Sequence, residues 1–292
     1  MRPDYSSVLE FYNSFIAEYS IIMEAEETKN QNESNNKTVK NDNTDKKKDE
    51  NIQSQISSKG GDLIKTLVDK LITFIKISIE KIQNRFSNLL ETDKGFKKEL
   101  RKRELQIKPV EGLEITTYRY DTSFLEGIMH RADAEYTKIL NYLYSASENK
   151  LVANSTTELR SEYIKKICGK EFESVKDFLE YVKTKFRGKK VAYKYNKAQL
   201  PAIIQQAENA TSLARNMTKI NTDSNIAIKK IKAQIDRQKY TNNSETYTQL
   251  KKNLELAKEA SSIYLSVASY YTELSIERNM SYRIILKKFY QF

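Results

Sequence analysis

The fold class of this chain is decided by residues 62–90, which read DLIKTLVDKLITFIKISIEKIQNRFSNLL. Apolar side chains recur in this stretch every three or four residues, the spacing that places them along one side of an α-helix. They are Leu63, Ile64, Leu67, Val68, Leu71, Ile72, Ile75, Ile79, Ile82, Phe86, Leu89 and Leu90. Lys, Arg, Asp and Glu fall largely on the opposite side, and the preceding Gly60, Gly61 and Asp62 provide a break and an N-cap. We therefore expect a long basic amphipathic helix over residues 62–108.

The apolar side of this helix admits two interpretations. It is either the inward face of a core helix, or a face that lies on a membrane surface or on a partner protein. In the second case the contact falls on Leu67, Leu71, Ile72, Ile75, Ile79, Ile82 and Phe86.

A run of positive charge follows, with seven Lys or Arg residues from Lys94 to Lys108. Such runs are commonly the solvated face of a helix, and binding of phosphate is the alternative. If the run binds a ligand, phosphate or an acidic partner is expected to contact Lys97, Lys98, Arg101, Lys102 and Arg103.

The chain upstream of residue 62 is divided by a polar tract. Residues 28–51, TKNQNESNNKTVKNDNTDKKKDEN, contain Val39 as their only apolar side chain, too little to offset the entropy of ordering. We expect a disordered polar linker over residues 25–61. Before it, apolar residues from Val8 to Met23 recur at helical spacing, which predicts an amphipathic helix within residues 1–24. A helix this short is marginal alone in water, so it should dock on the rest of the chain or on another molecule.

The composition favours helices and limits the chemistry. Among 292 residues there are 7 Gly and 3 Pro, which argues against a turn-rich sheet fold and for a mainly α protein.

Cys168 is the single cysteine and His130 the single histidine, so we expect no disulfide, no metal site and no cofactor. His130 is expected to be a partly buried structural residue. No glycine-rich phosphate loop or nucleophile elbow occurs, so we expect no catalytic residues and no enzymatic activity. A formal charge of +11 favours anionic partners.

The residue composition changes after Pro109. Residues 113–120 and 190–195 are rich in β-branched and aromatic side chains and predict two strands that could pair, with helices at 123–146, 156–168 and 174–187 between them. This predicts a small α+β region over residues 109–197. Residues 198–292 predict a C-terminal antiparallel helical bundle, with helices at 198–221, 224–240 and 244–290. The last of these carries a heptad seam at Leu250, Leu254, Ala257, Ser261, Tyr264, Ala268, Tyr271 and Ser275.

The two predicted strands mix aromatic and basic residues. The aromatic members are Tyr118, Tyr120, Tyr193 and Tyr195, and the basic ones are Arg119, Lys190, Lys194 and Lys197. Such a mixture suits base stacking with phosphate contact. Tyrosine on a half-buried sheet, with an apolar ring and a wet hydroxyl, explains the same pattern equally simply.

The layout of the first hundred residues resembles that of internal virion proteins of large tailed bacteriophages. In that family an N-terminal helix ends in a short acidic motif, a polar spacer follows, and a Lys- and Ile-rich amphipathic helix comes next. The related prohead protease selects Ile or Leu, any residue, then Glu, which Ile22, Met23 and Glu24 match, so the resemblance implies cleavage before Ala25. Leu89, Leu90 and Glu91 match as well but lie on a predicted helix, and proteases require an extended backbone.

The resemblance implies a non-enzymatic structural protein located in the capsid or prohead interior, and in the host cytoplasm during assembly. Its implied partners are capsid or prohead core proteins and packaged DNA, with no small-molecule substrate. A different class of function is a peripheral membrane-binding or effector-type protein that uses the amphipathic helix 62–90. A third is an ejected protein that acts on the host envelope, for which the sequence supplies no catalytic residues.

Overall fold

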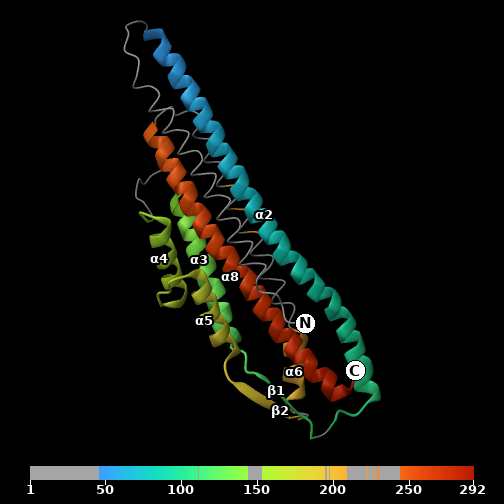
Figure 1. Ribbon diagram of the computed structural model, residues 1–292. Helices are drawn as coiled ribbons and strands as arrows, with labels where there is room; N and C mark the ends of the chain where they lie inside the picture. Colours follow the sequence, from blue (N-terminus) through green and yellow to red (C-terminus); the bar gives the residue numbers. More distant parts are fainter. Residues whose placement is uncertain are drawn as a thin grey trace. The chain divides into compact units, whose positions relative to one another are not determined.

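The computed structural model describes residues 46–110, 112–143, 153–194, 196, 198–208, 222, 226, 229 and 244–292 (Figure 1). The protein is mainly helical, as predicted, with one small sheet in the middle of the chain. The elements are α2 (Lys46–Gln106), β1 (Glu114–Tyr118), α3 (Thr122–Leu143), α4 (Thr156–Cys168), α5 (Val175–Arg187), β2 (Lys190–Lys194), α6 (Leu200–Glu208) and α8 (Ser244–Tyr290).

Residues Ile64–Phe292 form one compact unit, which we call the helical body. The segments expected at 62–108, 109–197 and 198–292 all contribute to one apolar cluster within it. The predicted N-terminal helix within residues 1–24, and residues 25–45 of the predicted linker, lie outside the described residues.

Helix α8 is the element on which the others pack. Helices α3, α4, α5 and α6 all contact it. The predicted heptad seam is buried from Leu254 to Ser275, and the side chain of Leu250 lies outside the described set. Because the seam includes Ala257, Ser261 and Ala268, neighbouring backbones can approach α8 closely. The core therefore follows the length of this one helix.

Helices α4 and α5 begin and end where the sequence predicts. The Oγ atoms of Ser155 and Ser174 accept hydrogen bonds from the backbone N–H of Glu158 and Asp177, each at 3.1 Å, and so cap the two N-termini. Gly169 adopts φ +74° at the C-terminus of α4, a left-handed conformation that glycine adopts without strain. Helix α3 spans Thr122–Leu143, and residues 144–146 of the expected helix lie outside the described residues.

The two predicted strands pair in an antiparallel sheet, with Ile115 opposite Tyr193 and Tyr118 opposite Lys190. Ile115 and Tyr193 face the apolar cluster described below, whereas Glu114, Thr116, Ala192 and Lys194 on the other face are exposed. A two-stranded sheet is marginally stable by itself in water, so its packing on the helices is what holds it.

The start predicted for the long basic helix is wrong. Helix α2 begins at Lys46, sixteen residues before Asp62, and continues through Gly60 and Gly61. Each glycine costs a helix only about 1 kcal/mol relative to alanine, and the flanking Lys, Glu, Gln and Ile residues form helices readily. Helix α2 therefore includes residues 46–61, which the prediction assigned to the linker. At the other end α2 stops at Gln106, close to the expected residue 108.

The helices predicted at 198–221 and 224–240 are described only in part. Helix α6 spans Leu200–Glu208, and of the following segment residues 222, 226 and 229 are helical. Ala207 of α6 lies beside Asn279 of α8, while Ile203 belongs to the cluster around Tyr282 and Leu286. The two helices are therefore antiparallel.

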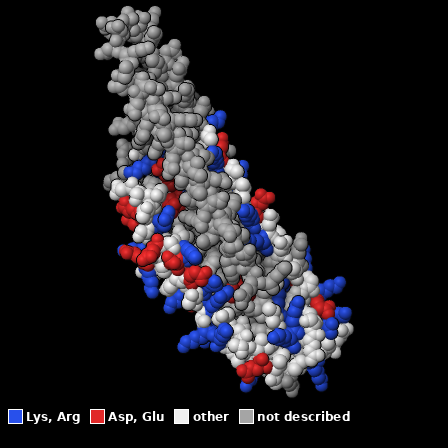
Figure 2. All heavy atoms as spheres, in the orientation of Figure 1, with Lys and Arg blue, Asp and Glu red and all other residues white. Residues whose placement is uncertain are grey.

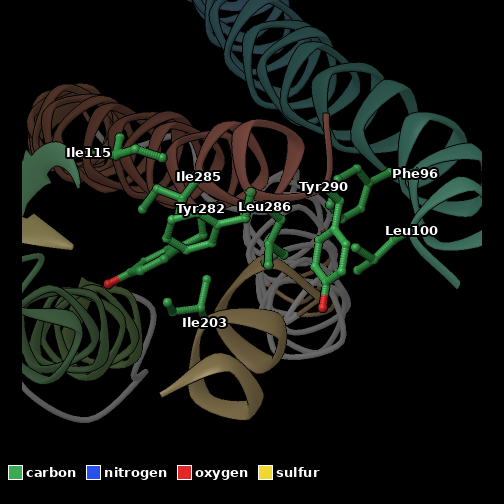
Figure 3. Packing of buried hydrophobic residues seen from close by; sticks show 10 residues of the cluster. Phe96, Leu100, Ile115, Ile203, Tyr282, Ile285, Leu286 and Tyr290 are labelled. Carbon is green, nitrogen blue, oxygen red and sulfur yellow. The ribbon is translucent and has the colours of Figure 1, made fainter. Parts of the chain in front are cut away.

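One apolar cluster joins the ends of α2 and α8 to the sheet and to α6 (Figure 3). Its buried members are Phe96, Leu100, Ile115, Ile203, Ala207, Tyr282, Ile285, Leu286, Phe289 and Tyr290. Because these residues come from four elements, the cluster fixes the basic half of α2 against the rest of the helical body.

Candidate functional site

The basic stretch of α2 is held by the apolar cluster beneath it. Phe96 stacks on Phe292 at a centroid distance of 5.9 Å, and Leu100 is 2 % exposed. After the helix ends, the backbone N–H of Val110 donates to the carbonyl of Phe289 at 2.9 Å. Contacts at Phe96, Leu100 and Val110 thus attach this stretch to the end of α8.

A buried ion pair marks the point where the basic stretch begins. Arg283 of α8, 3 % exposed, pairs with Asp93 of α2, and its guanidinium lies 5.1 Å from the centroid of the Phe96 ring. Burial lowers the pKa of Arg283, and the Asp93 carboxylate opposes that shift. Such a pair is costly to break because Arg283 without Asp93 would be a buried, uncompensated charge. It therefore sets the position of α2 along α8.

The five cations predicted as a ligand contact divide into two groups. Lys97 pairs with Asp93 at 2.8 Å, and Arg103 pairs with Glu99 at 2.9 Å. The hydrogen bond from Arg103 lowers the pKa of Glu99. These two cations are therefore already engaged in ion pairs within α2.

The other three of the five, Lys98, Arg101 and Lys102, are exposed and form no ion pair within the described part of the chain. Their spacing of three and four residues places them on one face of α2. This face, which we call the cationic face of α2, can attract an anionic group without first breaking an internal ion pair.

Further exposed cations surround the apolar cluster. Lys287 and Lys288 lie in the last turns of α8, and Arg119, Lys189, Lys190 and Lys194 lie on or beside the sheet. Lys194 pairs with Glu114 at 3.1 Å. Figure 2 shows Lys and Arg side chains distributed along α2 and around the end of the body that carries the sheet. We call this part of the molecule the basic end.

The apolar face of α2 is covered. Leu67, Leu71, Ile72, Ile75, Ile79, Ile82 and Phe86 are all buried. Arg85, on the same helix, pairs with Glu273 of α8. The arrangement is that of a core helix, and the face becomes available to a membrane or a partner only if α2 separates from the body. None of the described helices is long and apolar enough to cross a membrane.

The strand tyrosines lie on different sides of the sheet. Tyr193 packs against the apolar cluster, and Tyr120 also packs inward, 5.1 Å from the Phe186 ring, with its hydroxyl 2.8 Å from Ser281 Oγ. Burial raises the pKa of Tyr120. Tyr118 lies on the solvent face, whereas Tyr195 and Lys197 lie outside the described residues. Two of the four tyrosines are therefore structural.

The residues that could carry chemistry are dispersed. His130 is exposed on α3, which corrects the expectation of a partly buried histidine: it occupies the outward side of a helix whose inward side holds Ile128 and Met129. The Cys168 thiol lies 3.5 Å from the carbonyl of Lys170, and burial raises its pKa, which disfavours the thiolate. Across the described ranges, no group of three or more His, Cys, Asp or Glu side chains is placed to hold a metal ion.

The predicted processing residues Ile22, Met23, Glu24 and Ala25 lie outside the described residues. The second match to the cleavage motif, at residues 89–91, lies within α2, and Leu89 is buried. A protease would have to unwind the helix to reach it.

Sequence reasoning missed the acidic residues through which α8 binds its neighbours. Glu259 pairs with Arg160 of α4 at 2.6 Å, Glu273 with Arg85 of α2, and Glu277 with Arg187 of α5. Isolated Glu residues between apolar positions look like ordinary surface residues, and only the helices opposite them identify these as internal contacts.

No protein-family model, curated protein or solved structure matches this chain.

Proposed function

We propose that this chain is a non-enzymatic structural protein of a phage virion, located inside the capsid or prohead, whose helical body binds packaged DNA through the cationic face of α2. The observation that carries the proposal is the presentation of Lys98, Arg101 and Lys102 as exposed cations on a firmly packed helix.

The rigidity of α2 supports phosphate binding. A cation on a mobile segment loses conformational freedom when it binds, and that loss weakens the complex. Here Leu100 is buried and Asp93 is held by Arg283, so the backbone between residues 93 and 100 is already ordered. Cations that neutralise phosphates also release condensed counterions, which favours binding at low salt.

The N-terminal segment has a separate role in this proposal. Residues 1–24 direct the protein to prohead core proteins in the host cytoplasm during assembly, and the prohead protease then cuts between Glu24 and Ala25. The support is the match of Ile22, Met23 and Glu24 to the cleavage motif and the polar tract that follows.

The alternative function, membrane binding through residues 62–90, receives less support. Ile72 and Ile79, which would enter a bilayer, are buried in the helical body. Exposing that face would remove its apolar side chains from the core, at about 25 cal/mol for each Å² exposed.

The DNA contact is tested with Lys98→Ala/Arg101→Ala/Lys102→Ala and a labelled DNA duplex over a range of salt concentrations. We expect weaker binding and a salt slope smaller by about 0.9 for each lost phosphate contact. A matched control, Lys65→Ala/Lys76→Ala/Lys138→Ala, removes three other exposed cations and should change binding less. Equal binding by the two triple variants would refute the DNA contact.

The virion location is tested by mass spectrometry of purified particles. The proposal expects the chain in the particles with Ala25 as its mature N-terminus. A chain that retains Met1 in purified particles would refute processing, and absence of the chain from particles would refute the location.

A further inference from the structure

The solvent face of the β1–β2 sheet carries one aromatic ring among small residues. On this face Tyr118 lies opposite Lys190, and the next pair along is Thr116 with Ala192. Thr116 and Ala192 are exposed and short. The Tyr118 ring, which is half-buried, has these short side chains beside it along the sheet, and the ring of Tyr120 lies edge-on to it at a centroid distance of 6.2 Å.

Two cations lie close to this ring. The Lys190 Nζ is 5.6 Å from the Tyr118 ring centroid, and the guanidinium carbon of Arg187 is 5.5 Å from it. Arg187 is also bound to Glu277, so its charge is largely compensated. Lys190 is exposed and forms no ion pair with the described residues, so it is available to a ligand.

A tight corner brings more positive charge to the same place. Gly188, between α5 and β2, has φ +55°, and a Cβ there would lie 2.6 Å from the carbonyl oxygen of Arg119. The backbone N–H of Arg119 donates to the carbonyl of Lys189 at 2.9 Å. The end of β1 and the start of β2 therefore meet closely, so the exposed Arg119 and Lys189 form the next pair beyond Tyr118 and Lys190 along the two strands.

The carboxylates near this corner already have ion-pair or hydrogen-bond partners. Glu277 holds Arg187, and Glu114, at the far end of the sheet, pairs with Lys194. Asp121 accepts a hydrogen bond from the backbone N–H of Phe124 as the first turn of α3 begins. The cations around Tyr118 outnumber the carboxylates that face them.

We propose that this corner is a binding site for single-stranded nucleic acid, in which one base stacks on Tyr118 and the adjoining phosphates contact Arg119, Lys189 and Lys190. An aromatic ring within a positively charged groove is the arrangement by which proteins bind unpaired strands without sequence preference. In a duplex the faces of the bases are covered by their neighbours, so the ring selects the unpaired strand. The inference goes beyond the proposed function, because it uses none of the cations of α2.

The test measures fluorescence anisotropy of a labelled oligothymidylate with the full chain. Tyr118→Ala is expected to weaken binding by roughly 5- to 100-fold, the loss of one stacked base, whereas Tyr118→Phe keeps the ring and should bind as the wild type does. Lys189→Ala/Lys190→Ala is expected to weaken binding and to lower the salt slope by about 0.7 for each lost phosphate contact.

Two controls separate this site from general charge and from the proposed function. Lys138→Ala/Lys176→Ala removes two exposed cations elsewhere and should leave binding unchanged. The triple variant of the cationic face of α2 should weaken duplex binding while the Tyr118 effect on oligothymidylate persists. Circular dichroism of each variant verifies that it is folded. The site is overturned if wild-type protein does not bind oligothymidylate, or if Tyr118→Ala binds it as tightly as Tyr118→Phe.

Discussion

Arg187 of α5 donates two hydrogen bonds to the carboxylate of Glu277 on α8, at 2.8 and 2.7 Å. The pair is bidentate and only partly exposed, a geometry in which an ion pair stabilises more than it does on an open surface. Glu259 and Glu273 also pair with arginines, of α4 and α2 respectively. Helix α8 thus holds three surrounding helices by one carboxylate each, in addition to its apolar seam.

Arg187→Ala should lower the free energy of unfolding by about 1–3 kcal/mol, because Glu277 would lose its positively charged partner while remaining largely buried. Glu277→Gln, which keeps the shape and one hydrogen-bond acceptor, should cost less. Urea unfolding followed by circular dichroism measures both. The exposed pair of Lys165 with Glu171 supplies the control, and Lys165→Ala should cause no measurable change. Equal losses for Arg187→Ala and Lys165→Ala would contradict the role given to the buried pair.

Two glycines should respond in opposite directions to substitution by alanine. At Gly188 the positive φ and the nearby Arg119 carbonyl both oppose a Cβ, so Gly188→Ala should destabilise by more than about 1 kcal/mol. Gly95 lies exposed within α2, where a Cβ would meet no atom within 4 Å. Gly95→Ala should therefore stabilise by about 0.5–1 kcal/mol, since alanine favours the helix.

Thermal unfolding of the two glycine variants side by side tests both expectations. A higher melting temperature for Gly188→Ala than for the wild type would mean that the corner between α5 and β2 relaxes easily. The placement of Arg119 beside Lys189 would then not depend on glycine.

The elements that the sequence predicts well are those fixed by local signals. Ser174 at the start of α5 and Gly169 after α4 act on the backbone within a few residues, so each can be recognised without knowing the fold. The two strands can be recognised for a similar reason, since Ile115 and Tyr193 lie in short runs of β-branched and aromatic residues.

The remaining features of α2 are harder to predict, because they depend on the whole helix and on the residues of other elements that pack against it. The local rule that a pair of glycines ends a helix fails at the start of α2. Gly60 and Gly61 resemble a helix break, but each destabilises a helix too little to end it, and α2 begins at Lys46. In the basic run the two ion pairs follow the i,i+4 spacing of a helix and can be read from the sequence, whereas the burial of Asp93 depends on α8. Lys97 and Lys98 are adjacent in sequence, yet only Lys97 lies against Asp93, which the buried Arg283 holds in place.

The pair of stacked tyrosines between α3 and α8 should be among the most sensitive positions. The rings of Tyr136 and Tyr264 lie 4.4 Å apart at an angle of 8°. The Ser261 hydroxyl donates to the carbonyl of Ala257, so Tyr136 donates to Ser261 Oγ, at 2.9 Å. Tyr136→Ala should cost about 3–5 kcal/mol through the cavity it leaves.

The hydroxyl can be separated from the ring at this position. Tyr136→Phe removes only the hydrogen bond and should cost about 0.5–1.5 kcal/mol, measured by the same urea titration. Lys138→Ala, at an exposed position two residues along α3, should leave the unfolding midpoint unchanged. If Tyr136→Phe cost as much as Tyr136→Ala, the ring stack would contribute little.

The stability of the protein should rise with pH above neutrality because of Lys258. Burial in α8 lowers its pKa to about 8, although Glu259 and Glu255 oppose the shift. The unfolded chain keeps this proton up to the ordinary value of 10.5, whereas the folded protein releases it near 8. Between these values the unfolded state binds more protons, so the free energy of unfolding increases as pH rises from about 8 toward 10.

Lys258→Met tests this assignment, because it keeps the length of the side chain and removes the titrating amine. Urea midpoints measured from pH 7 to about 9.5 should rise for the wild type and stay level for the variant. The window ends there because ordinary tyrosines titrate near 10, and buried ones such as Tyr163, whose pKa burial raises, then favour unfolding. At neutral pH the variant should be the more stable protein, since it no longer holds a buried charge. A midpoint that rises equally in both proteins would assign the effect to another group.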